Sequence, residues 1–499
     1  MSSAPPLRQP AGLRALFLTE LWERFSYYGL RGLLILYMTA AVGEGGLGFD
    51  TATAGAIYGI YSGLVYLACL PGGWIADRFI GAQRATWYGG ILILSGHLCL
   101  AAPISNTFVL GLSLVIIGTG LLKPNISTMV GQLYTADDPR RDGGFSIYYM
   151  GINLGAFLAP LVCGWLALGM PFRGMLRHAG LAPELAWHWG FGAAAIGMAL
   201  GLFFYWHGRS NFSRQSLRPA HAPSVQEQRR LVQGLLAGTL LIGGALVATH
   251  TGGLSIARIS DLFGLALMII TVGFFGWIFT TPGWSHEERH NLRLILVLFI
   301  GAVVFWSLFE QGGSTLNLFA ARDTNRHLPW FDFEFPATWF QSINPILIIA
   351  LAPLFAAWWT RLGARNPPST HKFIAGLIFA SAGFAVLIVA AKLAADGHLV
   401  SPWWLIATYS LHTLGELCLS PVGLSAMSRL APARIAGLTM GVWFLATSIG
   451  NYLGGRAASF YDTLSLPELF TAITVAGALA AILLALAMRL ILKPRTVTS

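Results

Sequence analysis

The chain has 499 residues, of which 55% are hydrophobic and only 10% are charged. Soluble domains carry about 25% charged residues, so this composition excludes an ordinary soluble protein and indicates an all-α integral membrane protein. The formal net charge of +10 is compatible with nucleic-acid binding, but the positions of the cations favour a membrane surface and no nucleic acid.

The N-terminal segment MSSAPPLRQPAGLR is polar and basic, and no short apolar core with a small-residue cleavage site follows it. We therefore expect the first hydrophobic run to be a true span and not a signal peptide. A span needs roughly 20 mostly apolar residues. The sequence predicts fourteen such runs, near residues 14–42, 53–76, 84–101, 107–133, 143–168, 187–206, 231–249, 261–280, 291–313, 337–360, 371–393, 402–428, 433–456 and 466–490.

The lysines and arginines indicate the orientation, because cytoplasmic loops of membrane proteins carry an excess of them. With the N-terminus inside, most of these cations lie in inner loops, and Arg24, Arg31 and Lys123 lie within spans. The few that then lie outside are Arg173, Arg177, Arg258, Arg322, Arg326, Lys392 and Arg456. We therefore expect a multi-pass protein of the cell (inner) membrane with both termini in the cytoplasm.

Polar segments divide the predicted spans into three groups. Residues 207–230 form the longest polar break and follow six spans. Two more spans come next, and the polar segment TPGWSHEERH then introduces a second set of six. We predict an N-terminal six-helix bundle over 1–206, a linker with two extra transmembrane helices over 207–290, and a C-terminal six-helix bundle over 291–499.

Seven charged residues fall well inside the predicted spans. Each would cost about 2.5–3.5 kcal/mol at the centre of a bilayer, so lipid exposure of all seven would cost about 20 kcal/mol. They therefore face each other, as structural ion pairs, or line an internal polar pathway, and we favour the pathway. The seven are Glu20, Glu23, Arg24, Arg31, Lys123, Glu310 and Glu416.

The stretch ELWERFSYYG in the first span places a polar stripe on one helical face. Glu20, Glu23 and Arg24 stand at i, i+3 and i+4. Tyr27, Tyr28 and Arg31 continue the same face. Over the whole chain four intramembrane carboxylates face three cations, so one carboxylate lacks a cation and its protonated form is favoured. We expect this proton-binding carboxylate near Glu20 or Glu23, where two acids share Arg24.

Depth along the helix axis suggests two pairs of opposite charge. With a rise of 1.5 Å per residue, Arg31 and Glu310 lie about 25 Å and 28 Å from the inner starts of their spans. Lys123 and Glu416 lie roughly 24 Å and 21 Å from the outer starts of theirs. We expect Arg31–Glu310 and Lys123–Glu416 to act as alternating gates near the two faces.

Several motifs resemble those of the proton-dependent oligopeptide transporter family. ELWERFSYYG at 20–29 resembles the family motif E-x-x-E-R-F-x-Y-Y-G, and FSIYYMGINLGAF at 145–157 resembles its second signature. GLLKPNISTMVG at 120–131 and GELCLSPVGLSAMSRLAP at 415–432 resemble its fourth and tenth spans. GGWIADRFIGAQR at 72–84 is similar to a loop motif of the wider major facilitator superfamily.

The resemblance implies two six-helix bundles that rock around a central cavity and import di- and tripeptides together with protons. It implies a proton-coupling cluster of Glu20, Glu23 and Arg24. It implies no cofactor or metal beyond the coupling proton, and a chain that functions as a monomer in membrane lipid. We interpret Asp77 and Arg84 as a conformational latch at the cytoplasmic face and not as a substrate site. The residues that resemble pocket and gate positions are Tyr27, Arg31, Tyr66, Lys123, Asn153, Trp306, Glu310, Asn344, Glu416, Ser420 and Trp443.

The chemistry of a short peptide, which is a zwitterion, fits these residues. Arg31 and Lys123 suit its carboxylate, and Glu416, with Glu310 second, suits its ammonium group. Amide side chains suit its peptide bond, and aromatic side chains provide tolerant walls for its own side chains. These are the amides Asn153 and Asn344 and the aromatics Tyr27, Tyr66, Trp306 and Trp443. Plain packing roles for Trp306 and Trp443, and a helix–helix hydrogen bond for Asn153, remain open.

Two other classes of function remain open from the sequence: a carrier of non-peptide cargo, and a membrane-embedded enzyme or passive channel. A relative with non-peptide cargo, such as nitrate, would share the fold, although the E-x-x-E-R pattern is intact here. An enzyme would need a nucleophile–base pair or a metal set, and a channel would not need a proton-linked acid cluster. The four cysteines lie in apolar runs without metal-type spacing, so we expect inert thiols. We expect a transporter and not an enzyme.

Overall fold

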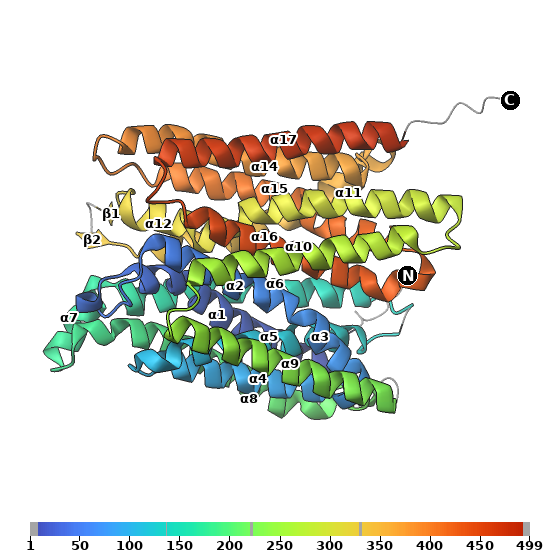
Figure 1. Cartoon of the computed structure of the whole chain (residues 1–499), viewed down its shortest axis with the longest axis horizontal. Helices are drawn as coiled ribbons and strands as arrows, with labels where there is room; N and C mark the ends of the chain where they lie inside the picture. Colours follow the sequence, from blue (N-terminus) through green and yellow to red (C-terminus); the bar gives the residue numbers. More distant parts are fainter. Residues whose placement is uncertain (1–7, 136, 220–222, 329–331, 493–499) are drawn as a thin grey trace, which may run out of the picture. The chain divides into compact units, whose positions relative to one another are not determined.

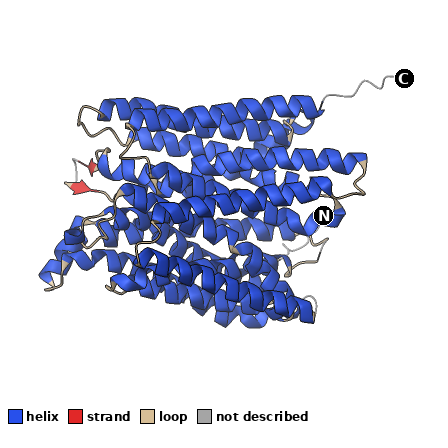
Figure 2. Cartoon of the chain, in the orientation of Figure 1, coloured by secondary structure: helices blue, strands red, loops and turns tan. Residues whose placement is uncertain are grey.

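The computed structural model describes residues 8–135, 137–219, 223–328 and 332–492. Helices make up most of this part of the chain, and two short paired strands lie among the loops (Figure 2). The prediction of an all-α architecture is confirmed.

By its internal contacts the chain divides into two compact units. Unit 1 comprises Met1–Leu47 and Leu67–Ile259, and unit 2 comprises Gly48–Tyr66 and Ser260–Ser499. The second helix of the chain therefore belongs mainly to unit 2. This division does not test the predicted domain boundaries after residues 206 and 290, which stay predictions.

In unit 1, the first helix packs against two others. Helix α1 contacts α6 and α8, and α4 contacts α5 and α8. Gly81, just before α4, has a φ of 80°, and a Cβ there would lie 2.8 Å from the backbone of Leu217. Glycine is therefore required at this turn. The helices are α1 (Ala11–Thr39), α3 (Cys69–Ile75), α4 (Ala82–Ala101), α5 (Phe108–Gly131), α6 (Arg141–Leu168), α7 (Met170–His178), α8 (Ala186–Gly208) and α9 (Val225–His250).

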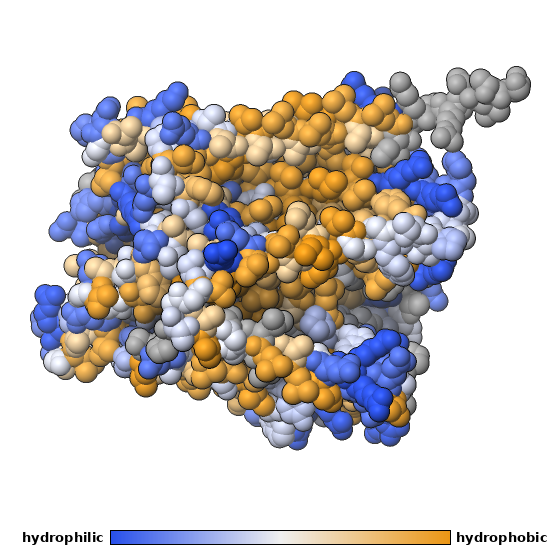
Figure 3. Space-filling model, in the orientation of Figure 1, coloured by the Kyte–Doolittle hydropathy of each residue, from blue (hydrophilic) through white to orange (hydrophobic). Residues whose placement is uncertain are grey.

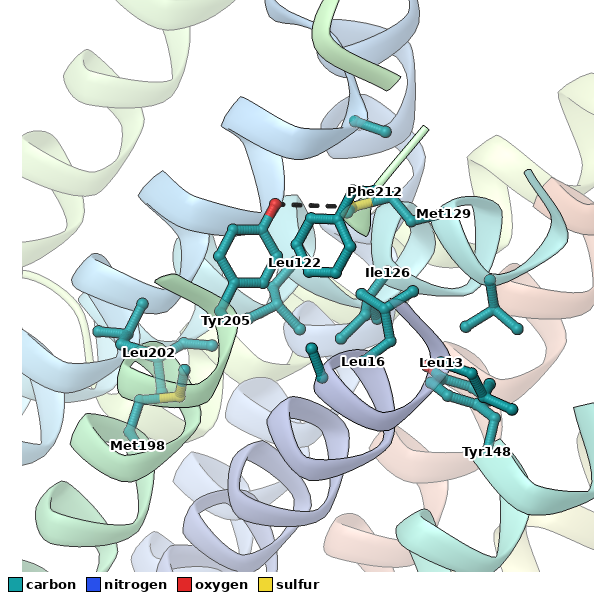
Figure 4. Close-up of a cluster of buried hydrophobic side chains, with 14 of the residues drawn as sticks. Leu13, Leu16, Leu122, Ile126, Met129, Tyr148, Met198, Leu202, Tyr205 and Phe212 are labelled. Atoms are coloured by element: carbon teal, nitrogen blue, oxygen red, sulfur yellow. Dashed lines mark hydrogen bonds between the residues drawn. The ribbon is translucent and has the colours of Figure 1, made fainter. Parts of the chain in front are cut away.

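A cluster of buried apolar side chains joins these helices near the start of α1 (Figure 4). Leu16 of α1, Ile126 of α5 and Leu202 of α8 meet there. The Tyr205 hydroxyl donates to the carbonyl of Gln83 at 2.8 Å, so the polar end of this core aromatic is satisfied. The cluster fixes α1 in the middle of unit 1, which is where its charged stripe requires protein neighbours.

In unit 2, helix α14 packs between α15 and α17, and α11 packs on α16 (Figure 1). Helix α11 begins at a capping box, in which the Ser285 hydroxyl accepts from the Glu288 amide and Glu288 accepts from the Ser285 amide. The helices are α2 (Thr51–Leu67), α10 (Ile256–Thr280), α11 (His286–Phe309), α12 (Thr315–Arg322), α13 (Ile343–Leu362), α14 (Ser369–Ala394), α15 (Trp403–Leu430), α16 (Ala436–Ala458) and α17 (Leu466–Leu492).

Helix α2 lies against α16 through glycines spaced four residues apart. A Cβ on Gly55 would lie 2.7 Å from the Ser459 amide nitrogen, and one on Gly59 would lie 2.9 Å from the Tyr452 carbonyl oxygen. The Ser448 hydroxyl donates to the Gly63 carbonyl at 2.7 Å. Small residues thus allow the two helix backbones to approach closely.

Three polar side chains hold the start of α2, and we call them the Asp462 clasp. The Thr51 hydroxyl donates to one carboxylate oxygen of Asp462. Arg322, at the end of α12, donates to the other at 2.9 Å and to the Thr51 hydroxyl at 3.2 Å. The clasp therefore ties α2 to α12 and to the α16–α17 loop.

A small hairpin follows α12. Strand β1 (His327–Leu328) pairs antiparallel with β2 (Phe333–Glu334), with His327 opposite Glu334. Arg326 forms an ion pair with Glu334 at 2.6 Å. The described residues of this loop thus form a strand pairing that the sequence did not predict.

Nine helical segments within the described ranges are long and apolar enough to cross a membrane. Apolar side chains cover α14 and α17 in the space-filling view, and hydrophilic ones gather toward the helix ends (Figure 3). This pattern fits a multi-pass membrane protein. The predicted count of fourteen spans is not confirmed and stays a prediction. The cysteines are free thiols, with Cys69, Cys163 and Cys418 buried and Cys99 half-buried.

Candidate functional site

The charged stripe of α1 is buried inside unit 1. Glu20, Glu23 and Arg24 are each no more than 2% exposed. The Arg24 guanidinium binds both carboxylate oxygens of Glu23, through Nε and through Nη2 at 2.7 Å. Its Nε also lies 3.4 Å from a carboxylate oxygen of Glu20. The predicted spacing at i, i+3 and i+4 thus brings the three groups together, with Glu23 as the closer partner.

Glycines on α6 make room for this cluster. A Cβ on Gly155 would lie 2.2 Å from the Leu21 carbonyl oxygen and 3.0 Å from Cβ of Arg24. One on Gly151 would lie 2.9 Å from the Phe17 ring. Both glycines belong to the GINLGAF segment, so this segment acts by letting α1 approach α6.

Two further polar residues lie within electrostatic reach of Glu20. They are Tyr148 of α6 and Lys123 of α5. Lys123 also interacts electrostatically with Glu23 and Arg24. The sequence analysis described two acids sharing one arginine, whereas the structure places a second cation close to the same acids. The unit 1 site is therefore a four-charge cluster of Glu20, Glu23, Arg24 and Lys123.

The stripe continues toward Arg31 through tyrosines. The Arg24 guanidinium carbon lies 4.9 Å from the Tyr27 ring centre, and that of Arg31 lies 5.7 Å from the Tyr28 ring centre. Tyr27 and Arg31 are buried. Such cation–π contacts give the guanidinium groups protein neighbours in place of lipid.

Other predicted residues of the N-terminal half occupy separate positions. Asn153 of α6 is buried, and its amide donates to the Tyr149 carbonyl of its own helix at 3.0 Å. Tyr66 is buried on α2. In the π-helical turn Ala76–Ile80 after α3, an ion pair of 3.4 Å joins Arg78 to Glu227 of α9. The latch of Asp77 and Arg84 stays a prediction.

In unit 2, the helix that carries Glu310 is interrupted. Helix α11 ends at Phe309, a 3₁₀ turn covers Glu310–Gly313, and α12 begins at Thr315. The polar side chains around the break are buried, and they are Glu310, Gln311, Ser314, Thr315 and Asn317. Irregular backbone at membrane depth requires burial in protein or a cavity. This break was not among the expectations from the sequence, although EQGGS, with two adjacent glycines, was a signal for it.

Glu416 and Asn344, which the sequence analysis placed in the pocket, lie together. The Asn344 amide donates to a carboxylate oxygen of Glu416 at 2.9 Å and to the Thr413 hydroxyl at 3.1 Å. Ser420 is half-buried one turn further along α15. His412, one turn before Glu416, places Nε2 3.2 Å from the Ala380 carbonyl oxygen and is a buried structural residue.

Two tryptophans pack edge to face in the same unit. The ring centres of Trp306 and Trp443 lie 6.2 Å apart at 86°. A Cβ on Gly450 would lie 2.4 Å from Cβ of Trp306, and one on Gly423 would lie 2.6 Å from the Trp443 ring. Trp306 Nε1 is buried and has no hydrogen-bond acceptor within the part of the chain that is described. A donor in this state suits a ligand that brings its own acceptor.

The segment HEERH at 286–290 has the H-E-x-x-H spacing of zinc metalloproteases, which the sequence analysis overlooked. It forms the first turn of α11, where Glu288 serves the capping box. Among the described residues, no three His, Cys, Asp or Glu side chains are grouped so that they could hold a metal ion.

The predicted gate pairs each combine one residue of unit 1 with one of unit 2. Arg31 and Lys123 belong to unit 1, and Glu310 and Glu416 belong to unit 2. Both pairs, Arg31–Glu310 and Lys123–Glu416, therefore stay predictions. The structure does group Arg24 with the buried carboxylates Glu20 and Glu23 in unit 1, and Asn344 with the half-buried carboxylate Glu416 in unit 2.

Comparison with known proteins identifies similar sequences and structures. A family model described as "PTR2: POT family" matches residues 83–473. The chain is 42% identical to "Peptide transporter YePEPT" of Yersinia enterocolitica, covering 96% of this chain and 93% of that one. It is 36% identical to the "Di-/tripeptide transporter" of Lactococcus lactis subsp. cremoris, covering 97% and 96%. The crystal structure of "peptide transporter POT in complex with sulfate" aligns with a TM-score of 0.87 at 39% identity, covering 97% and 95%.

Proposed function

Because the chain belongs to the POT family, we propose that it is a proton-coupled symporter that imports di- and tripeptides by alternating access. The observation that carries the proposal is the four-charge cluster of Glu20, Glu23, Arg24 and Lys123, in which the first three residues are buried and Lys123 is half-buried. Buried ionisable groups in a membrane protein mark ion or substrate pathways.

The four-charge cluster supports a proton-coupling role because its charge balance can change by one proton. Glu23 is fully engaged by Arg24, while Glu20 is held by Arg24 through one longer contact. Protonation of one carboxylate would leave a cation to attract another anion. In this scheme the released cation, Arg24 or Lys123, binds the peptide carboxylate, so that proton and substrate binding favour each other.

The residues of unit 2 suit the other end of the peptide. Glu416 presents a carboxylate for the peptide ammonium, and Asn344, which also donates to the Thr413 hydroxyl, holds that carboxylate in place. The Trp306 indole offers an N–H to a peptide carbonyl, and Trp443 adds an apolar wall. Arg31 and Glu310 would close the pathway on one side, and Lys123 and Glu416 on the other.

The proposal also includes the membrane location, the orientation and the oligomeric state of the protein. The chain spans the inner membrane with both termini in the cytoplasm, functions as a monomer, and needs no cofactor other than the proton. Its relatives are transporters and not enzymes. A nitrate-like anion as cargo is disfavoured because E-x-x-E-R is intact.

Uptake of labelled dialanine into proteoliposomes tests this function. We expect accumulation with an inward proton gradient and loss of most of it, about tenfold or more, in Lys123→Ala, because a cationic partner of the buried acids Glu20 and Glu23 is removed. Lys392→Ala, at an exposed lysine of α14, is the matched control. Accumulation that does not depend on the proton gradient, or that is unchanged in Lys123→Ala, would contradict the proposal.

Proton coupling has its own test in peptide exchange without a gradient. We expect Glu20→Gln or Glu23→Gln to keep exchange but lose gradient-driven accumulation, because a neutral side chain cannot cycle a proton. Glu44→Gln, at an exposed position, is the control. Full accumulation in both cluster variants would mean that the coupling carboxylate lies elsewhere.

A further inference from the structure

An apolar groove of about 600 Å³ runs along unit 2 between α10, α11 and α16. Met268 and Val272 of α10, Phe299 and Val303 of α11, and Leu453 of α16 are among its lining residues. Only 17% of the most apolar stretch of α10 is buried in the protein. The groove therefore opens toward the hydrocarbon that surrounds a membrane helix.

Helices α10 and α16 are fastened at one end of the groove. The Tyr452 hydroxyl donates to the Ser260 carbonyl at 2.9 Å. A Cβ on Gly264 would lie 2.4 Å from that hydroxyl oxygen, so the glycine permits the contact. Beyond this point the groove between the helices is open.

The same end carries a pair of opposite charges. Arg456 of α16 donates to Asp261 of α10 at 3.0 Å. Asp261 keeps 63% of its side chain exposed and Arg456 keeps 26%. Asp261 itself lines the groove. One exposed anion and one accessible cation thus lie at the mouth of an apolar channel.

The length of the groove matches one leaflet. From Asp261 to Val272 the helix rises about 16 Å, at 1.5 Å per residue. Half of the hydrocarbon core of a bilayer measures about 15 Å. Asp261 lies near the start of α10, so its charge falls at headgroup depth when Val272 lies near the membrane centre.

We propose that this groove binds one phosphatidylethanolamine molecule, with an acyl chain along Met268 and Val272. The lipid ammonium donates to the Asp261 carboxylate, and the lipid phosphate accepts from the Arg456 guanidinium. A choline headgroup has no N–H to donate, and a glycerol headgroup has no cation for Asp261. The site therefore selects a primary-amine headgroup and not merely an acyl chain.

Native mass spectrometry of the purified chain, titrated separately with phosphatidylethanolamine, phosphatidylcholine and phosphatidylglycerol, tests the proposal. We expect one phosphatidylethanolamine to be retained in preference to the other two. Asp261→Asn and Arg456→Gln should each lower that retention by roughly three- to fivefold, as for a partly exposed ion pair. Asp261→Asn should leave retention of phosphatidylcholine nearly unchanged, because choline has no N–H to donate to that carboxylate.

Two variants on α10, one inside the groove and one outside it, distinguish lipid binding in the groove from general lipid contact. Val272 lines the groove and is 66% exposed, while Ile269 does not line it and is 61% exposed. Val272→Phe should reduce phosphatidylethanolamine retention, and Ile269→Phe should not. Equal retention of the three lipids, or equal behaviour of these two variants, would overturn the proposal. So would a dimer that Val272→Phe dissociates, because the groove would then be a contact between two copies.

Discussion

Trp306 has a buried N–H without an acceptor among the residues described, which is an unfavourable state for a folded protein. Replacing it with phenylalanine removes that donor and leaves most of the ring contact with Trp443. If the N–H serves the substrate, the variant should lose affinity without losing stability.

We therefore expect Trp306→Phe to keep or slightly raise the melting temperature and to raise the KM for dialanine by about tenfold, the factor for one lost hydrogen bond of about 1.4 kcal/mol. Trp358→Phe, at an exposed tryptophan of α13, is the control. Thermal unfolding and initial uptake rates measure the two quantities. A lower melting temperature with an unchanged KM would show that Trp306 is a packing residue.

Asp323, just after α12, provides a pH-dependent contribution outside the membrane-spanning segments. Burial raises the pKa of its carboxyl above the ordinary value of 3.8, although it accepts a hydrogen bond from Tyr461 at 2.6 Å and Arg322 lies nearby. Asp462 adds a further raising effect on the pKa. Because the folded state binds the proton more tightly than the unfolded state, stability falls as pH rises from 3.8 through the raised pKa.

We expect Asp323→Asn to remove this part of the pH dependence and to raise the melting temperature at pH 7 relative to wild type, since the amide oxygen can still accept from Tyr461. Asp462→Asn should lower the melting temperature at pH 7, because it removes the charge that pairs with Arg322 in the clasp. Melting curves between pH 4 and pH 8 measure both. Parallel curves for wild type and Asp323→Asn would exclude a role of this carboxyl.

Among the elements, the contact of α2 with α16 depends on the absence of side chains. Gly59 meets the Tyr452 carbonyl oxygen at a Cβ distance of 2.9 Å. Gly59→Leu should therefore force the helices apart and lower the free energy of unfolding by about 1–3 kcal/mol, as for other overpacked sites. Gly234→Leu on α9 is the control, because no atom lies within 4 Å of its Cβ position. An equal melting temperature for the two variants would contradict the close packing.

The extent of sequence prediction differs between elements. The stripe of α1 was predictable because helical periodicity alone places Glu20, Glu23 and Arg24 on one face. Lys123 beside Glu20 was not predictable, since depth along an axis gives no lateral distance between helices. The room for Trp306 and Trp443 comes from glycines on α16 and α15, and only packed neighbours reveal which glycines matter. The break at Glu310–Gly313 had a local signal in the two adjacent glycines of EQGGS, but the hydropathy of the surrounding run predicted a continuous span.

At the scale of the whole molecule, the motifs and composition predicted the family, the helical class and the transport function. They could not reveal that α2 contacts mainly the C-terminal helices. These contacts join residues about 400 positions apart in the sequence, such as Ser459 and Ala52, and only the three-dimensional structure shows that such residues are close. The hydrogen bonds of the Asp462 clasp also join residues that are far apart in the sequence, so the sequence could not predict them.

The proposed orientation of the whole chain has a direct test. A fluorescent protein that matures only in the cytoplasm, fused after Ser499, should fluoresce, since both termini are expected inside. The same fusion after Gly252, between α9 and α10, should stay dark. Fluorescence at Gly252 and none at the C-terminus would reverse the orientation.

The burial of the native thiols has a practical consequence for following the transport cycle. Reaction with maleimides needs an accessible thiolate, and Cys69, Cys163 and Cys418 are enclosed by protein. With Cys99 replaced by alanine, a single engineered thiol in a loop would be the fastest to label. Site-directed labelling from either side of a vesicle could thus monitor alternating exposure in an otherwise native sequence.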